Sequence, residues 1–263
     1  MKQLAVIVVL LAALSTAAPA SAQQAPGQGS RTDIGGTQGK QAFSVRGHLI
    51  VWGSMGLDLD VIGDVTASSL GSIRGTGMLI DATAYPDVYV RTQRRRSVGV
   101  GFGIFDRTEV FARYQDADNP AATVTVGQFG AKTNTFAVSF DNYKDHMIDF
   151  GIRKYLASPR SSRVYFALAG GMKTVEPLSM TMQVPGGNVR TELYGKSNIL
   201  ALGLEFGLTL EYHKIGMFAE AGFRYQKRLA RNDSELALYQ LEGVNDTGFR
   251  LFMPATVGLL VRF

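Results

Sequence analysis

The stretch from residue 200 to residue 211 alternates strictly between large apolar side chains and small, polar or charged ones. A period of two is that of a β-strand, whose side chains point to opposite faces. The apolar face carries Leu200, Leu202, Leu204, Phe206, Leu208 and Leu210, and the other carries Ala201, Gly203, Glu205, Gly207, Thr209 and Glu211. The facing surfaces of a soluble β-sandwich need bulky apolar residues. This pattern instead favours a membrane barrel that is apolar outside and polar inside.

The composition also favours a membrane β-barrel. From residue 23 onward, no apolar run approaches the ~18 residues of a membrane helix. A membrane protein without such helices has to be a closed β-barrel, because lipid satisfies no backbone hydrogen bonds. The chain has no Cys, which excludes disulfides and thiol chemistry. Its net charge of +5 is too mild and too scattered to predict nucleic-acid binding.

The first 22 residues have the features of an export signal. Lys2 precedes an apolar stretch from Leu4 to Leu14, and Ala20-Ser21-Ala22 forms a small-x-small cleavage site. We therefore expect a cleaved signal peptide over 1–22. Residues 23–44 are rich in Gln, Gly, Ser and Thr without periodicity, which predicts a flexible periplasmic lead-in to a barrel over 45–263.

Eight alternating segments predict eight antiparallel strands in an all-β, up-and-down transmembrane barrel. They cover about residues 46–57, 89–105, 109–116, 145–156, 163–174, 197–212, 215–228 and 249–263. The connections alternate strictly between long and short, as in outer-membrane barrels with long external loops, short periplasmic turns and both termini inside. A ten-stranded barrel is the alternative if 122–129 and 134–142 enter the membrane. We favour these two segments as a hairpin that extends the second long loop.

Turn-forming residues mark expected loop tips at Asp118-Asn119-Pro120, Pro185-Gly186-Gly187 and Asn232-Asp233. Pro254 departs from the strand pattern, because a closed barrel has no free edge for a residue without an N–H. We expect Pro254 near the outer end of the last strand, at a bulge.

The inward positions of the predicted strands collect five acids and five bases. They are Glu109, Arg113, Asp149, Arg153, Lys173, Glu205, Glu211, Glu220, Arg224 and Arg262. An eight-stranded barrel is only wide enough for side chains to fill, and charges inside it are costly unless paired. We expect a network of ion pairs across the lumen and no continuous channel. In a ten-stranded barrel the same residues would line a small aqueous pore.

The last eight residues end on an aromatic side chain and keep the alternation. Thr256, Gly258, Val261 and Phe263 occupy the four specified positions of a pattern that resembles the C-terminal assembly signal of bacterial outer-membrane β-barrels. With the strand pattern, the chain is similar to the OmpA-barrel and OmpX-like family, porin-family outer-membrane proteins. The resemblance implies a Gram-negative outer membrane and recognition of the last strand by the barrel-assembly machinery.

Basic and aromatic residues extend the outward faces of the strands. Arg94, Arg96, Lys144, Lys196 and Lys227 are expected near the outer rim, where their charges suit the phosphates of lipopolysaccharide. The alternative is that they are solvated rim charges. Tyr114 and Tyr225 near the outer rim, with Tyr212 and Phe263 near the inner one, fit aromatic girdles.

The sequence offers little for catalysis. Among its three histidines, only His146 lies on the side where such barrels do chemistry, with Asp145 and Ser139 as conceivable partners. We expect no enzyme activity, no cofactor and no metal site, since no Cys and His spacing suggests one. The predicted function is a monomeric structural or surface-interaction barrel that contacts outer-membrane lipid and acts through four long loops. A small diffusion pore is the alternative, and a lipid-modifying enzyme is the third possibility.

Overall fold

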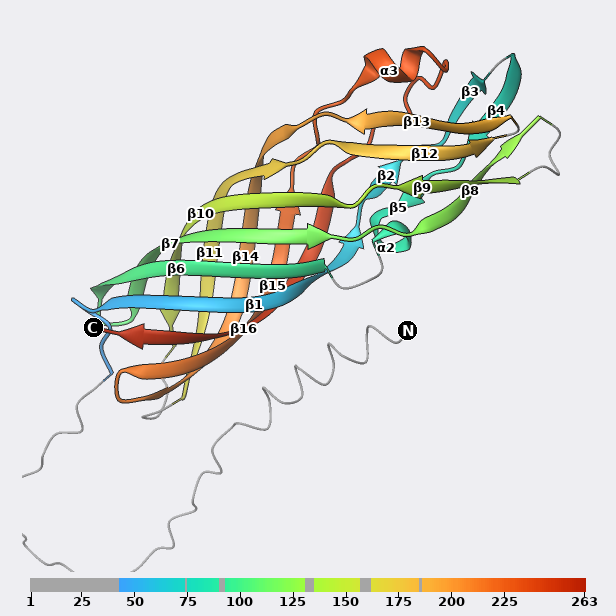
Figure 1. Cartoon of the computed structure of the whole chain (residues 1–263). Coiled ribbons are helices and arrows are strands. Elements are labelled where there is room, and N and C mark those ends of the chain that lie inside the picture. Colours follow the sequence, from blue (N-terminus) through green and yellow to red (C-terminus); the bar gives the residue numbers. More distant parts are fainter. Residues whose placement is uncertain (1–42, 74, 90–92, 131–134, 157–161, 185) are drawn as a thin grey trace, which may run out of the picture. The chain divides into compact units, whose positions relative to one another are not determined.

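Eight long antiparallel strands close into a barrel in the computed structural model (Figure 1), which describes residues 43–73, 75–89, 93–130, 135–156, 162–184 and 186–263. Neighbours in the chain are neighbours in the barrel, and β1 closes against β16. The strands are β1 (Leu49–Ile62), β6 (Gln93–Phe105), β7 (Thr108–Asn119), β10 (Tyr143–Tyr155), β11 (Ser162–Val175), β14 (Ser197–Tyr212), β15 (Ile215–Gln226) and β16 (Arg250–Arg262). The predicted fold class and strand count are confirmed. The signal peptide and most of the lead-in lie outside the described residues.

The stagger of the strands sets the width of the barrel. One row of paired residues runs from Ile50 through Gly101, Phe111, Gly151, Ala169, Gly203, Arg224 and Phe252, and returns to β1 at Asp60. The row therefore climbs ten residues along β1 in one circuit. Strand number, stagger and tilt together determine the diameter, and eight strands leave an interior that side chains fill.

The two faces of each strand differ as the alternation predicts. On β6 the outward Val98, Val100 and Phe102 are 60%, 43% and 47% exposed, whereas Gly99 and Gly101 face inward. The even-numbered residues of β14 from Leu200 to Leu210 likewise form an apolar outer face, while Glu205 is 1% exposed inside the barrel. The exterior is thus an apolar belt around a polar interior. No helix in the described parts of the chain is long and apolar enough to cross a bilayer.

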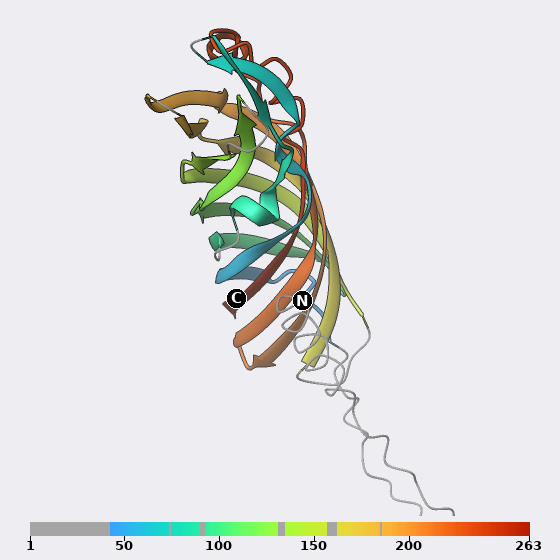
Figure 2. The same cartoon turned by 90° about the vertical axis from the view of Figure 1, so that its right-hand side faces the viewer.

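The connections differ greatly at the two ends of the barrel, here named the turn end and the loop end. At the turn end, β6 passes to β7 through residues 106–107 and β14 passes to β15 through His213 and Lys214. At the loop end, most strands continue into further structure (Figures 1 and 2). A six-stranded sheet there has the order β13-β12-β9-β8-β4-β3.

The loop-end sheet draws its strands from three different long connections. They are β3 (Ser69–Ile73), β4 (Thr76–Ile80), β8 (Thr123–Phe129), β9 (Thr135–Phe140), β12 (Leu178–Val184) and β13 (Gly187–Tyr194). A small ladder of β2 (Asp64–Thr66) and β5 (Thr83–Ala84) and the short helices α2 (Tyr85–Val88) and α3 (Asp233–Ala237) complete this end. Because β8 pairs with β9 outside the barrel, the hairpin interpretation is confirmed and the ten-stranded alternative is wrong.

All four long connections share one apolar core. Tyr85 and Val138 are fully buried in it, as are Leu178 and Leu241. The predicted tip at Gly186-Gly187 is correct, since Gly186, which follows β12, and Gly187, which begins β13, both have positive φ; Pro185 lies outside the described residues. The other two expected tips are wrong: Asp118 and Asn119 end β7, and Asn232 immediately precedes α3.

Pro254 lies inside β16 and not at its outer end. It is paired in register with Asp58 of β1, and no bulge occurs there. On the other side, pairing with β15 stops after Ala221–Ala255 and resumes in the same register at Arg224–Phe252. A proline has no N–H to donate to the ladder. The barrel accommodates Pro254 by interrupting one seam locally, which corrects the expected bulge.

Residues 43–48 close the turn end of the barrel. Val45 is fully buried, its N–H donates to the Asp106 carbonyl at 2.9 Å, and the Gly47 N–H donates to the Gly103 carbonyl at 2.8 Å. Phe43, which the sequence places in the lead-in together with Ser44, packs edge-on against Tyr155 with 5.5 Å between ring centroids. Phe43 and Ser44 therefore contact the barrel, although the sequence places them in the lead-in.

The absence of a side chain at Gly103 allows residues 43–48 to approach β6 closely. A larger residue at this position should therefore displace them. A Cβ at Gly103 would lie 1.8 Å from the Val45 carbonyl oxygen, so Gly103→Val should displace residues 43–48 from the turn end. We expect trypsin to cleave after the exposed Arg46 at least about tenfold faster in the folded variant, because local unfolding exposes the peptide bond. Gly53→Val is the matched control, since its Cβ would meet nothing closer than 3.9 Å. Equal cleavage rates in the two variants would contradict the contact.

Candidate functional site: the charged interior of the barrel

The centre of the interior is organised by Arg113 of β7. Its guanidinium group donates to Asp149 through Nε at 3.1 Å and Nη2 at 2.9 Å. It also donates from Nη2 to Glu205 at 2.9 Å and from Nη1 to Glu220 at 3.0 Å. The three carboxylates come from β10, β14 and β15, so one side chain joins four strands across the barrel. The planar fork of arginine is suited to several carboxylates at once.

Arg224 adds a second bridge to the same carboxylates. Its Nε donates to Glu205 at 2.8 Å and its Nη2 donates to Asp149 at 2.7 Å. The remaining Nη1 contacts the Met147 sulfur at 3.2 Å. All these side chains are nearly inaccessible, with Arg224 and Glu205 each 1% exposed. Buried charges of this kind are tolerated only when they are paired and hydrogen-bonded.

Arg153 lies next toward the turn end among aromatic rings. Its Nη1 donates to Glu109 at 3.0 Å, and it forms a longer ion pair of 3.5 Å with Glu220. The guanidinium carbon lies 4.6 Å from the Tyr165 ring centroid and 4.9 Å from that of Trp52. The hydroxyls of Tyr155 and Tyr165 donate to Glu109 and Glu220 at 2.7 and 3.0 Å. The rings therefore fill the space that the charges leave.

Seven of the ten predicted interior residues meet in this central tier. They are Glu109, Arg113, Asp149, Arg153, Glu205, Glu220 and Arg224. Glu211 and Arg262 pair at 2.7 Å in a separate tier at the turn end, together with Arg163, which lies 2.5 Å from Glu211. The Phe43 ring covers this tier, with the Arg163 guanidinium carbon 3.6 Å from its centroid.

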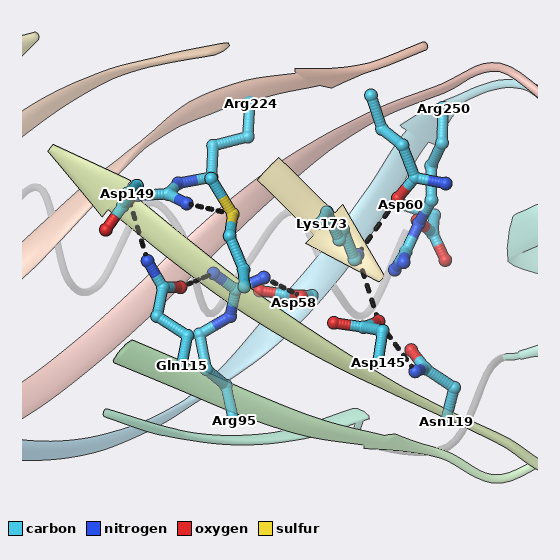
Figure 3. Close-up of polar contacts among 12 residues, drawn as sticks. Asp58, Asp60, Arg95, Gln115, Asn119, Asp145, Asp149, Lys173, Arg224 and Arg250 are labelled. Atoms are coloured by element: carbon cyan, nitrogen blue, oxygen red, sulfur yellow. Dashed lines mark hydrogen bonds and ion pairs between the residues drawn. The ribbon is translucent and has the colours of Figure 1, made fainter. Parts of the chain in front are cut away.

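A third tier, toward the loop end, contains mostly residues that the sequence analysis missed. Lys173, the tenth predicted residue, pairs with Asp145 at 2.9 Å and donates to Gln226 at 2.9 Å (Figure 3). Arg95 pairs with Asp58 at 2.5 Å, and Arg250 pairs with Asp60. The side chain of Gln115 contacts Arg95 and donates to Asp149 at 2.9 Å, which links this tier to the central one.

Strand parity was the signal that could have found these residues. Arg95 lies between the outward Arg94 and Arg96, so it has to point inward. Arg250 has the same parity as Arg262 on β16, and Asp145 has the same parity as Asp149 on β10. With Arg163 and the loop-end residues, the described interior holds eight bases and eight acids. The charges therefore balance without any bound ion.

The outward basic residues do not form the uniform girdle that the sequence suggests. Arg94 and Arg96 on β6 and Lys144 on β10 flank the acidic residues Asp116 and Asp118 of β7. Lys196 and Lys227 are also exposed, but they lie before β14 and after β15, away from that group. Tyr114, Tyr225, Tyr212 and Phe263 are outward, with exposures of 44%, 46%, 80% and 63%.

The conceivable catalytic group around His146 does not form. Asp145 points into the barrel toward Lys173, whereas the outward His146 approaches Asp116, with 2.7 Å between its Nδ1 and Oδ1. The Ser139 hydroxyl lies 2.9 Å from that of Thr123 in the loop-end sheet. Asp145 and Ser139 are therefore not partners of His146; Asp145 is directed away from it because adjacent strand residues face opposite ways. Within the described residues, no cluster of His, Cys, Asp and Glu could hold a metal.

Comparison with known proteins finds similarity only to solved structures, at low sequence identity. No protein family model and no curated protein matches the sequence. Neisserial surface protein A is 12% identical, with 83% of this chain and 100% of that chain covered and a TM-score of 0.44. OprG from Pseudomonas aeruginosa is 14% identical, with 84% and 98% covered and a TM-score of 0.41. Ail of Yersinia pestis is 12% identical, with 83% and 99% covered and a TM-score of 0.39. Scores of this size carry no argument about function, and the fold rests on the closed strand order.

Replacing Arg113 should lower the free energy of unfolding far more than replacing a surface arginine. Arg113→Met would leave three buried carboxylates short of a partner, and breaking a buried pair costs about 3–5 kcal/mol. Arg228→Met, at an exposed position of the loop end, should change the unfolding free energy by less than about 0.5 kcal/mol. Urea unfolding of both variants in detergent micelles measures the difference. Equal stabilities would contradict the network.

Proposed function

We propose that the chain is a bacterial outer-membrane β-barrel whose lumen is closed by paired charges and whose ordered loop end provides a surface for interactions outside the cell. Two features support the membrane location. The closed strand order leaves no edge of the barrel ladder open to lipid, and the exposed outer face is apolar. Export through residues 1–22 and recognition of Thr256, Gly258, Val261 and Phe263 by the assembly machinery belong to the same proposal.

One observation supports the proposal of a closed lumen most directly: Arg113 bridges carboxylates from three other strands at the barrel centre. The loop-end tier and the turn-end tier, which Phe43 covers, add further obstruction on either side. Ion flow would require several buried pairs to separate, at a cost of several kcal/mol for each ion left unpaired. A small diffusion pore is therefore the less favoured function.

The surface-interaction role is supported by the order of the loop end. A flexible loop loses conformational entropy when it binds, whereas a preorganised surface does not. Here the four long connections are packed around a shared core and pair with one another, as Met182 of β12 does with Val138 of β9. Binding and catalytic residues are commonly placed on loops held by a rigid scaffold. The loop-end sheet extends that scaffold beyond the barrel.

Conductance tests the closed lumen. The refolded mature protein, with heat-modifiable gel migration as proof of folding, should show no steady openings in a planar bilayer. The double variant Arg113→Ala with Arg224→Ala should open a measurable water path wherever it still folds, because it removes the two bridging cations of the central tier. Arg228→Ala is the control and should stay silent. Steady openings from the unaltered, folded protein would refute the closed lumen and favour the pore.

A further inference from the structure

A shallow apolar groove lies on the lipid-facing side of three adjacent strands, β6, β7 and β10. It has a volume of about 570 Å³ and is lined on its outer side by Val100, Phe102, Val110, Ala112, Phe150 and Ile152. Ala112 pairs in register with Val100 on one side and with Phe150 on the other. A small residue between two large ones makes the hollow. Its size and shape suit a single hydrocarbon chain lying along the strands.

A polar cluster lies on the same three strands, two register steps further toward the loop end. After the apolar row that contains Tyr114, the next outward row consists of Arg96, Asp116 and His146. The His146 ring stacks on Tyr114 with 6.3 Å between centroids, and the Tyr114 hydroxyl lies 3.1 Å from its Nδ1. On the outside of the barrel, in line with the groove, Arg96 is exposed and Asp116 and His146 are half-buried.

The charges of this cluster are not balanced. Asp116 is engaged by His146 at 2.7 Å, and Asp118, in the following row, is engaged by Lys144 at 4.0 Å. Arg94 and Arg96 are exposed, and neither forms an ion pair within the described parts of the chain. With His146 neutral, these two rows carry three positive charges against two negative ones, and the guanidinium groups of Arg94 and Arg96 present the excess positive charge to an anion from outside the protein. Guanidinium forks bind phosphate well.

The two arginines stand at the edge of the apolar surface and not beyond it. On the neighbouring strand β1, Arg96 is opposite Met55, which is 68% exposed, and Arg94 is opposite Leu57. The apolar face of β1 continues toward the loop end to Val61, which is 44% exposed. A charged side chain in such a position is stabilised by an anionic lipid headgroup, because the hydrocarbon beside it offers no counter-ion.

We propose that β6, β7 and β10 form a binding site for lipopolysaccharide. One acyl chain of its lipid anchor lies in the groove over Ala112, and a phosphate of the same molecule is bound by Arg94 and Arg96. Asp116 and Val110 are six residues apart on β7, so groove and cluster span about 20 Å along the strand. This inference rests on the proposed outer-membrane location, and it uses two of the five predicted contact residues, Arg94 and Arg96.

The binding test uses purified lipopolysaccharide added to the refolded mature protein in zwitterionic micelles, with the dissociation constant measured by titration calorimetry. Ala112→Phe fills the groove and should weaken binding about tenfold, the equivalent of 1.4 kcal/mol. Ala219→Phe is the matched control, because Ala219 faces lipid on β15, on the opposite side of the barrel. Equal affinities of these two variants would overturn the groove assignment.

The phosphate contact has its own pair of variants. Arg94→Gln with Arg96→Gln should weaken binding at least tenfold, whereas Lys196→Gln with Lys227→Gln should leave it within about twofold. Dephosphorylated lipopolysaccharide should bind the unaltered protein as weakly as intact lipopolysaccharide binds the arginine variant. Equal losses in the arginine and lysine pairs would overturn the site. So would full competition by phosphatidylglycerol, which would make a phospholipid the occupant.

A folding assay distinguishes an error in the proposed lipid site from an error in the proposed function. A protein that shows heat-modifiable migration but binds lipopolysaccharide no better than the double arginine variant would refute the lipid site alone. A protein that never acquires heat-modifiable migration in bilayers would refute the membrane barrel, and the lipid site with it.

Discussion

The closure of the backbone ladder is the constraint on which the rest of the structure depends. With eight strands and a stagger of ten, no strand edge of the barrel remains open, and the enclosed space is narrow enough for side chains alone to fill it. In so narrow an interior, every charged side chain that points inward has to find a partner on another strand. In a membrane, the outer faces of such a barrel have to be apolar.

The interior meets that requirement with cross-strand ion pairs and with glycines that leave room for them. A Cβ at Gly101 would lie 2.0 Å from Glu109, and one at Gly203 would lie 2.8 Å from Arg224, so the long side chains occupy the space above these glycines. Replacing such a network by apolar residues is often neutral for stability, whereas breaking a single pair is costly. The intact network is therefore expected to raise stability little, whereas the loss of one partner is expected to lower stability strongly.

Strand periodicity predicted the barrel well because burial on only one face forces the alternation. It identified Arg113 and Glu205 as interior partners, since their parity opposes the apolar face. It failed where parity was not followed to the strand ends, so Arg95 and Asp58 were missed, and Asp145 was grouped with its outward neighbour His146. Strand periodicity could not predict the loop-end sheet. Pairs such as Ile80 with Gly127 join separate connections, and short strands do not reveal their partners through period alone.

A double-mutant cycle on Arg113 and Glu205 tests the central claim most directly, because it measures the coupling between two strands across the lumen. The unfolding free energies of Arg113→Met, Glu205→Gln and the combined variant would be compared with that of the unaltered protein in bilayers. The closed, paired interior predicts a coupling energy of about 1–3 kcal/mol. Additive effects, within about 0.5 kcal/mol, would show that the two side chains do not depend on each other, and would contradict the account.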